Sequence, residues 1–409
     1  MRMLQGLDKN YVPFFLFYVF SFMAIAIFTI FVNVYLYHQG FSISQIGILT
    51  ALGPTISMLS QPVWGILSDR TNKRRILMIV LAGSAIISLA IPIHTAFFWL
   101  IIVLLLYWFF ASSSLPLGDA ITLQFLEGKS IKYSALRIIG AVSFGLTSAF
   151  AGLLLGGNIG RIFYYNAAFL TVTCLLVFFM PIQKKSKAEE QAQEPLQAQP
   201  QEQLQEQSGL KSLVKLLNNK VVLGVYLTSF IFGLTMSFLH NFFGIRMTEM
   251  GATEGQLGIA LFISAFSEIP IFLTVDRVFG KRKPEHLLML SAFFMGLRLI
   301  IMYFGETIIL IYLAQTLQGV SFMLHFYFCI VLLHEHSPPH MKSTVQTVHA
   351  MIRMGGAAIL GNLGGGFLAH QVGIQNVFLL LSVIVTSTCF VLPGVLILMH
   401  KVKNRNKSK

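Results

Sequence analysis

The feature that most constrains this chain is a succession of apolar stretches, each about as long as a membrane-spanning helix. A helix rises about 1.5 Å per residue, so crossing roughly 30 Å of hydrocarbon takes about 20 apolar residues. Only 11% of the 409 residues are charged and 55% are hydrophobic, whereas soluble proteins carry roughly 25% charged residues. The sequence therefore predicts an all-α integral membrane protein and excludes a soluble enzyme.

Twelve stretches have the length and composition of a membrane span, so we expect twelve transmembrane helices. The predicted spans are residues 12–35, 44–67, 76–94, 98–124, 134–156, 162–182, 221–244, 256–276, 286–304, 307–333, 344–368 and 375–400.

Basic residues are concentrated in the loops on one side of the predicted membrane. If the N-terminus is cytoplasmic, 24 of the 29 lysines and arginines fall in cytoplasmic segments. The others are Arg137, Arg161, Arg246, Arg298 and Arg353. Because cytoplasmic loops are enriched in Lys and Arg, the pattern predicts a multi-pass protein of the plasma membrane with both termini in the cytoplasm. The formal net charge of +13 then reflects topology, and the partner is the lipid bilayer, with no nucleic acid expected.

An acid and a base stand at the facing ends of two consecutive spans, at Asp119 and Arg137. Ionisable groups at membrane depth are costly and usually face a cavity, where they act in function. Gly140, Ala141 and Phe144 follow Arg137 at i+3, i+4 and i+7 and so share its helix face. This face offers a cation, a small-residue gap and an aromatic surface, which indicates half of a substrate site. The alternative is an inward Asp–Arg pair that only fixes helix packing.

A charged sequence follows span two, in which Gly65, Asp69, Arg70 and Arg74 are the key positions. Gly65 would let two helices approach closely, and Asp69 could accept hydrogen bonds from a neighbouring helix N-terminus. The sequence resembles the loop between spans two and three of the major facilitator superfamily, which implies a role in conformational gating. Asn72 stands where that family has a glycine, and asparagine also tolerates a left-handed turn.

The end of span eight repeats this pattern. Asp276 and Arg277 follow Pro270 as Asp69 and Arg70 follow Pro62. By the same resemblance, Asp276 and Arg277 are expected to take part in gating.

A second internal repeat relates span eleven to span five, because 353–356 echoes 137–140. The sequence therefore predicts two six-helix bundles in parallel repeat, residues 1–182 and 221–409. Between them, residues 183–220 form a cytoplasmic linker that we expect to be partly disordered, since its middle is rich in Gln, Glu and Pro. Transporters built this way bind their substrate near the midplane, between halves that rock to alternate access.

The first half resembles the lactose-permease branch of the superfamily most closely. The specific pattern is Pro116-x-x-Asp119 followed by Arg137-x-x-Gly140. In that family an acid on helix four and an arginine on helix five hold substrate hydroxyls, and the resemblance implies this role here. The family's acid is a glutamate, and its sugar-stacking tryptophan is replaced by Phe144. The aromatic first span, with its rings between 14 and 20, also fits, and we expect these rings to contact lipid.

The second half contributes the predicted coupling residues. Arg298 matches an arginine that the family couples to proton transfer, and Glu268 is the best candidate proton carrier. Gln318, Ser321 and His325 lie at i, i+3 and i+7, on one face of span ten. Gln318 and Ser321 occupy positions of the sugar permeases' coupling residues and are expected to bind substrate. His325 fits a pattern of phenylpropionate and nucleoside permeases, and histidine titrates near neutral pH, so it could join Glu268 in coupling.

Together these features predict a secondary transporter that takes up a small organic solute by proton-coupled symport and functions as a monomer. A glycoside or nucleoside would use the Asp119–Arg137 network, whereas an aromatic carboxylate would pair with Arg137 and stack on Phe144. The alternative is efflux of hydrophobic drugs or metabolites by proton antiport. A transport-inactive sensor is disfavoured because the central linker is too short and polar for an output domain. The sequence contains no catalytic constellation, so no enzyme, cofactor or metal site is expected.

Overall fold

The computed structural model describes residues 9–129, 131, 133–181, 219–279, 282–338 and 341–407. Within these residues the chain forms twelve helical stretches, each of which coincides with a predicted span. Nine of the described stretches are long and apolar enough to cross a membrane, and Ile374–Thr388 is a shorter apolar helix. The prediction of an all-α membrane protein is therefore confirmed. Residues 183–218 of the predicted linker lie outside the described residues, so the domain boundaries stay a prediction.

The first six stretches include short breaks at Ile30, at Ser112 and Ser113, and at Phe150. Their elements are η1 (Lys9–Tyr11), α1 (Val12–Thr29), α2 (Phe31–His38), α3 (Ile43–Arg70), α4 (Lys73–Ala90), η2 (Ile91–Ile93), α5 (Phe97–Ala111), α6 (Ser114–Leu126), α7 (Tyr133–Ala149), α8 (Ala151–Leu155) and α9 (Arg161–Phe179).

The last six stretches include two π-helical segments, at η4 and η6. Their elements are α12 (Lys220–Glu249), α13 (Glu254–Phe279), α14 (Pro284–Phe304), α15 (Ile308–Thr316), η4 (Gly319–Met323), α16 (Leu324–Glu335), α17 (Lys342–Met351), η6 (Ile352–Gly356), α18 (Ala357–Val372) and α19 (Ile374–Lys407).

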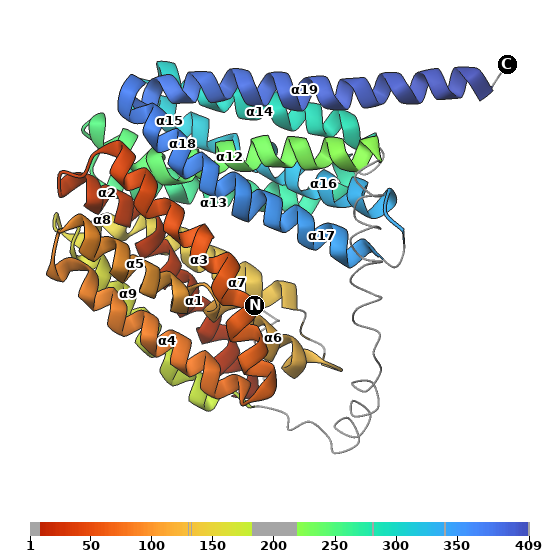
Figure 1. The fold of residues 1–409 in the computed structure, drawn as a ribbon. Helices are drawn as coiled ribbons and strands as arrows, with labels where there is room; N and C mark the ends of the chain where they lie inside the picture. The colour runs from red at the N-terminus through yellow and green to blue at the C-terminus, as the bar shows by residue number, and fades with distance from the viewer. Residues whose placement is uncertain are drawn as a thin grey trace.

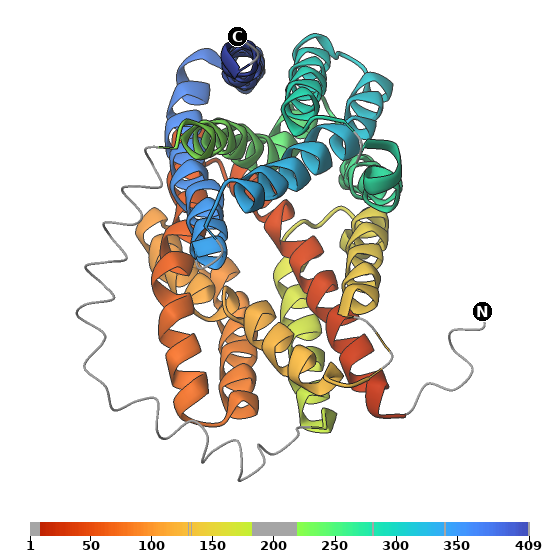
Figure 2. The ribbon, with the colours of Figure 1, turned by 90° about the vertical axis from the view of Figure 1, so that its right-hand side faces the viewer.

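The helices lie in two groups, α1–α9 and α12–α19 (Figure 1). The groups meet at the end of the molecule that carries α2, α8 and α15 and diverge toward α6 and α17. Figure 2 shows the same two groups from the side, one above the other. The helices that make contact across the groups are α3 with α18, α7 and α8 with α13, and α2 with α12.

Several close approaches at glycines join the groups, and two of them are made to backbone oxygens. A Cβ at Gly47 of α3 would lie 2.6 Å from the backbone oxygen of Asn362 in α18. A Cβ at Gly258 of α13 would clash with the backbone oxygen of Ser148 in α7. Glycine permits such backbone contacts because it has no side chain. Both contacts lie where α3 and α13 begin, so the two groups are closed together at that end.

The aromatic first helix is central to its group and does not face lipid as expected. The side chains of Phe14, Phe17 and Tyr18 are completely buried, because α1 packs between α7 and α9. The ring of Phe14 stacks on Phe125 of α6 at a centroid distance of 4.2 Å. The prediction of lipid contact is therefore wrong for these rings, which form the core of the first group.

The loop between α3 and α4 differs in its details from the expected pattern. Asn72 has a φ of −105° and caps α4, its side chain accepting from the backbone N–H groups of Arg74 and Arg75. It adopts an extended conformation, because this lets the amide oxygen reach the free N–H groups of the helix start. Gly65 has no atom within 4 Å of a built Cβ, so the expected close helix approach at Gly65 does not occur in this conformation.

Candidate substrate site and coupling network

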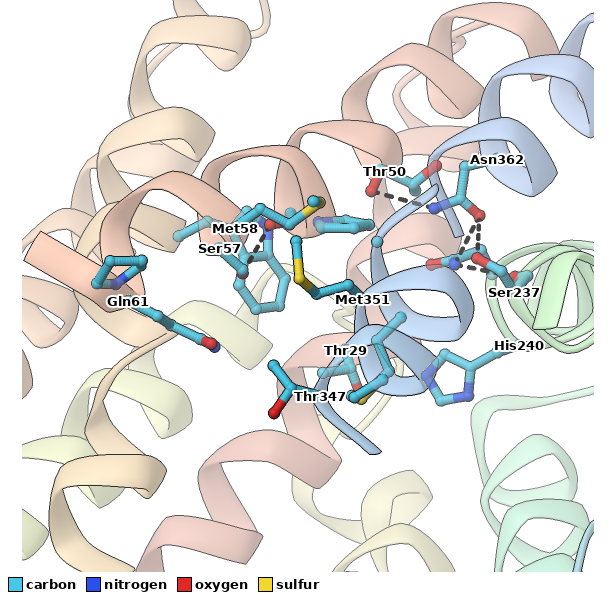
Figure 3. A pocket seen from close by; sticks show the side chains of 18 residues that line it. Thr29, Thr50, Ser57, Met58, Gln61, Ser237, His240, Thr347, Met351 and Asn362 are labelled. Carbon is cyan, nitrogen blue, oxygen red and sulfur yellow. Dashed lines mark hydrogen bonds between the residues drawn. The ribbon is translucent and has the colours of Figure 1, made fainter. Parts of the chain in front are cut away.

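A cavity of about 690 Å³ lies between the two groups of helices. This volume suits a small organic molecule. Helices α1, α3 and α5 contribute one side of its lining, and α12, α17, η6 and α18 contribute the other (Figure 3). The polar half of the lining is Thr29, Thr50, Ser57, Gln61, Ser237, His240, Asn241, Thr347 and Asn362. The other half is Gly53, Pro54, Met58, Pro62, Trp108, Ala350, Met351, Met354 and Gly355.

The polar groups of this lining are uncharged amino-acid types. The lining contains hydroxyl, amide and imidazole groups, and none of its residues is an Asp, Glu, Lys or Arg. The imidazole of His240 makes no hydrogen bond with the described residues, and Figure 3 shows it at the same side of the cavity as Ser237 and Asn362. The indole of Trp108 packs on Gly53, where a Cβ would lie 3.1 Å from the ring. The cavity therefore combines hydrogen-bonding groups with an aromatic surface.

A network of asparagines connects the two groups at one side of the cavity, and we call it the amide latch (Asn33, Asn241, Asn362). The Nδ2 of Asn33 donates to the backbone oxygen and to the Oδ1 of Asn241, both at 3.0 Å. The Nδ2 of Asn241 donates to Asn362 Oδ1 at 3.0 Å. The Nδ2 of Asn362 donates to the backbone oxygen of Thr50 at 3.3 Å. Because α2 and α3 belong to one group and α12 and α18 to the other, these bonds hold the groups together.

The predicted acid–base pair forms between α6 and α7. The Nη1 of Arg137 lies 3.5 Å from Asp119 Oδ2, and the hydroxyl of Tyr18 donates to Asp119 Oδ1 at 2.6 Å. The expected gap beside Gly140 is filled, because a Cβ there would lie 2.6 Å from the ring of Phe22. That ring also lies 5.3 Å from the guanidinium carbon of Arg137.

Neither the acid–base pair nor Phe144 contributes to the lining of the cavity. Phe144 is half-buried, and Ala141 on the same predicted face is exposed. The structure thus brings Asp119 and Arg137 together, while their role in binding substrate stays a prediction.

A second acid–base arrangement lies inside the C-terminal group and is bridged by an amide. The Nε2 of Gln318 donates to Glu268 Oε1 at 3.0 Å, and its Oε1 accepts from Arg298 Nη1. The Nη2 of Arg298 donates to Gln315 Oε1 at 2.6 Å. Arg298 is only 3% exposed. We call these four residues the coupling network, in which Gln318 connects the carboxylate to the guanidinium.

The π-helical segment η4 changes the expected face of span ten. A π turn contains more residues than an α turn, so the i, i+3, i+7 spacing does not keep Gln318, Ser321 and His325 on one face. Gln318 joins the coupling network, while the buried hydroxyl of Ser321 donates to Leu317 O at 2.8 Å in its own helix. Neither residue lines the cavity, so their predicted substrate contacts have no support in this conformation.

His325 lies in a separate buried cluster. Its ring stacks on Phe232 at a centroid distance of 3.9 Å, and its Nε2 lies 3.5 Å from Cys329 Sγ. The hydroxyl of Ser229 contacts Cys329 Sγ at 3.4 Å and His349 Nε2 at 2.9 Å. No described contact connects His325 to Glu268, so the expected partnership between these two residues is absent from this conformation.

Of the predicted gating residues, Asp69, Arg70 and Arg277 lie at the surface of the described part, whereas Gly65 and Arg74 are half-buried. Asp69 is 74% exposed, and its Oδ1 lies 3.8 Å from Lys73 Nζ. This weak ion pair takes the place of the expected hydrogen bonds from a helix N-terminus. Arg70 and Arg277 are exposed. Arg74 donates through Nη2 to the backbone oxygen of Met180, at the end of α9. The side chain of Asp276 lies outside the described residues.

Comparison with known proteins identifies the family. Residues 11–380 match the model of the MFS_1 like family. The chain belongs to this family. It is 26% identical, over 90% of its length and 89% of the relative, to the uncharacterized transporter YwbF of Bacillus subtilis (strain 168). It is 25% identical, over 90% of each chain, to the maltose permease of Geobacillus stearothermophilus.

The crystal structure of the nucleoside transporter NupG has the same fold. It superposes with a TM-score of 0.81 over 95% of this chain and 99% of NupG, at 18% sequence identity. The protein is therefore a major facilitator transporter of the MFS_1 like family. The predictions of this superfamily, and of a transporter and not an enzyme, are confirmed.

In this member of the MFS_1 like family, the sequence interpretation missed most of the cavity. Trp108 and Ser57 were not selected because aromatic and hydroxyl residues are common throughout apolar helices. Asn362 offered a usable signal, since it is an amide within residues 354–369, which are otherwise small or apolar. Gln315 offered a similar signal, because it is an amide three residues before Gln318 in an apolar span.

Proposed function

We propose that this transporter takes up a neutral, hydroxyl-bearing solute of the size of a nucleoside or a small glycoside, by symport with protons. The observation that carries the proposal is the uncharged lining of the 690 Å³ cavity between the two groups. Amide and hydroxyl groups match the hydroxyls of such a solute, which both donate and accept hydrogen bonds. The indole of Trp108 supplies a flat apolar surface for a sugar or base ring.

Charge argues against the aromatic carboxylate that the sequence left open. A carboxylate leaving water loses several kcal/mol of solvation unless a cation compensates it. Among the described residues no Lys or Arg lines the cavity, and Arg137 already contacts the carboxylate of Asp119. A neutral solute requires no such compensation. Asp119 and Arg137 do not line the cavity in this conformation. We retain them as partners for solute hydroxyls in another conformation of the transport cycle, in keeping with the resemblance to sugar permeases, and the likeness to a maltose permease agrees with this choice.

The amide latch supplies a mechanism for alternating access. It closes one end of the cavity, and the basic loops indicate that this end faces outward and that both termini are cytoplasmic, at the plasma membrane. For the solute to enter from outside, the bonds from Asn241 to Asn33 and from Asn362 to Thr50 must break as the halves rock. The segments around Gly65, which is half-buried here, and Arg277, which is exposed, would then close the inner end. All of these parts belong to one chain, so a monomer suffices.

Glu268 is the proposed proton carrier. As a carboxylate it accepts from Gln318, which in turn accepts from Arg298. Protonation of Glu268 removes the charge that orients the amide of Gln318. Because Gln318 directly precedes η4, this changes how η4 packs on α13. Gly319 N in η4 donates to Ser267 Oγ beside Glu268 at 2.9 Å. The charge of Glu268 therefore acts beside the contact between η4 and α13, and α13 also packs on α7 of the other group.

The direct test measures proton entry into proteoliposomes that contain a pH-sensitive dye. Uridine, maltose and 3-phenylpropionate are added separately, with protein-free liposomes as the control for permeant acids. We expect uridine or maltose to acidify the lumen and 3-phenylpropionate to behave as in the control. Acidification by the carboxylate alone would contradict the proposal. Expulsion of a hydrophobic dye by a preset proton gradient, without any response to the solutes, would favour efflux instead.

A further inference from the structure

A small recess opens beside the amide latch, next to the main cavity. Its volume is about 30 Å³, which is enough for one water molecule or one hydroxyl group. It shares Thr29, Thr50, Trp108 and Asn241 with the lining of the main cavity. Asn33 also lines the recess but does not line the main cavity. The recess is therefore an extension of the cavity toward the contact between the two groups.

Asn33 has an unused hydrogen-bond acceptor at this place. Its side chain is 1% exposed, and its Nδ2 makes both of its bonds to Asn241. Its Oδ1 is buried and has no partner among the described residues. A buried polar atom without a partner costs about 1–3 kcal/mol, so such atoms normally bind water or a ligand.

The orientation of the Asn33 amide follows from the direction of the latch. The three Nδ2 groups of the latch each donate to a backbone oxygen, of Asn241, Ser237 and Thr50. A flipped Asn33 would place its oxygen 3.0 Å from the backbone oxygen of Asn241, where two acceptors repel. The amide nitrogen of Asn33 must therefore face Asn241, and the oxygen remains available to a donor from the recess.

We propose that this recess is a hydroxyl subsite, in which Asn33 Oδ1 accepts a hydrogen bond from one hydroxyl of the transported solute. The inference rests on the proposed function, because it requires a hydroxylated solute in the main cavity. Asn33 on α2 is then a specificity-determining residue, and solute binding affects the amide latch through the same side chain. A hydroxyl seated there contacts the same amide that holds Asn241 of the opposite group.

The test compares hydroxyl and deoxy solutes in wild-type and variant proteins. Uridine and maltose are each supplied with their singly deoxygenated analogues, and kcat/KM is measured in proteoliposomes. In the wild-type protein, one deoxygenation should reduce kcat/KM roughly tenfold, because it leaves a buried acceptor unpaired. In Asn33→Leu, the parent solute should fall to the level of that analogue, and the difference between the two should disappear.

Asn362→Leu is the matched control, because it breaks the latch without changing the acceptor of Asn33. It should reduce transport of the parent and the analogue by the same factor and so retain the discrimination. Asn33→Ser carries a hydroxyl that is too short to replace the amide oxygen, so it should give the same result as Asn33→Leu. It serves as the test variant if Asn33→Leu does not fold.

Three results would overturn the inference. If no single deoxygenation changes wild-type kcat/KM beyond about twofold, the recess holds a resident water instead of a solute hydroxyl. If Asn33→Leu slows parent and analogue equally, Asn33 acts only in the latch. If the wild-type protein transports neither uridine nor maltose, the proposed solute class itself is wrong, and that result is recognised before any variant is made.

Discussion

In the first half of the molecule Arg137 contacts Asp119 directly, whereas in the second half Gln318 stands between Arg298 and Glu268. The side chains of the direct pair are 40% and 23% exposed, while Arg298 is almost completely buried. In a direct pair each charge compensates the other, so neither changes easily. The amide of Gln318 separates the two charges of the second half, so that Glu268 can gain a proton while Arg298 keeps its amide partners. The difference suits solute binding in the first half and proton coupling in the second.

The largest expected effect comes from Arg298→Met. This change leaves Gln315 and Gln318 without their donor, and breaking a buried charged network typically costs about 3–5 kcal/mol. We expect proton-driven uptake to fall by about 100-fold or more and thermal stability to drop clearly. Uptake in proteoliposomes and a thermal-shift assay measure the two effects. Arg277→Met is the control for charge, because Arg277 is exposed. Normal uptake by Arg298→Met would remove the coupling network from the mechanism.

Gln318→Leu tests the bridge itself. Without the amide, Glu268 loses its hydrogen bond and its connection to Arg298, so uphill accumulation should fall about tenfold. Exchange of solute across the membrane without a gradient should continue, since Gln318 does not line the cavity. Gln315→Leu removes only the other partner of Arg298 and should affect accumulation less. Equal losses in accumulation and exchange would instead assign Gln318 to solute binding.

Arg137→Ala tests the direct pair. Because the pair is partly exposed, its loss should change the free energy of unfolding by no more than about 1 kcal/mol. If the pair binds solute hydroxyls, KM should rise about tenfold. Asp119→Asn should give a similar rise, and the double variant should add little to either, since residues in contact are not additive. An unchanged KM in all three proteins would reduce the pair to a helix-packing contact.

The smallest expected effect is that of Tyr18→Phe, which removes the 2.6 Å hydrogen bond to Asp119. Loss of this bond should destabilise the protein by about 1 kcal/mol and raise KM by roughly threefold. Tyr107→Phe is a matched control, because its hydroxyl contacts Asn166 at 3.3 Å, away from the acid. The control should lose similar stability with an unchanged KM. A KM effect of the same size in both variants would show that it arises from packing alone.

The sequence predicted the parts of this molecule that depend on apolar length and on charge. Spans follow from the cost of crossing hydrocarbon, and the contact of Asp119 with Arg137 follows from their facing positions on adjacent helices. Glu268 and Arg298 were both selected as coupling residues, but the bridge between them through Gln318 was not expected. The π-helical η4 shifts Ser321, which lies within it, and His325, which follows it, so regular helical spacing misplaced both residues.

The uncharged parts of the site were not predictable in the same way. Serine, threonine and tryptophan are frequent in membrane helices, and only the packing of α3 and α5 against α12 and α18 selects Ser57 and Trp108 for the cavity. Asn33 and Asn241 become meaningful only because their helices come from opposite groups and meet. Gly65 and Asn72 show a further limit, since a shared motif did not determine their local contacts in this conformation.

We propose that solute and proton are handled by different groups in different places, and Glu268→Gln separates the two functions. Glutamine keeps an acceptor for Gln318 but carries no proton. With the solute that wild-type proteoliposomes transport, we expect counterflow exchange to continue at a rate close to wild type while accumulation driven by a proton gradient disappears. Accumulation at the wild-type level, or loss of exchange together with accumulation, would contradict the separation of the two sites.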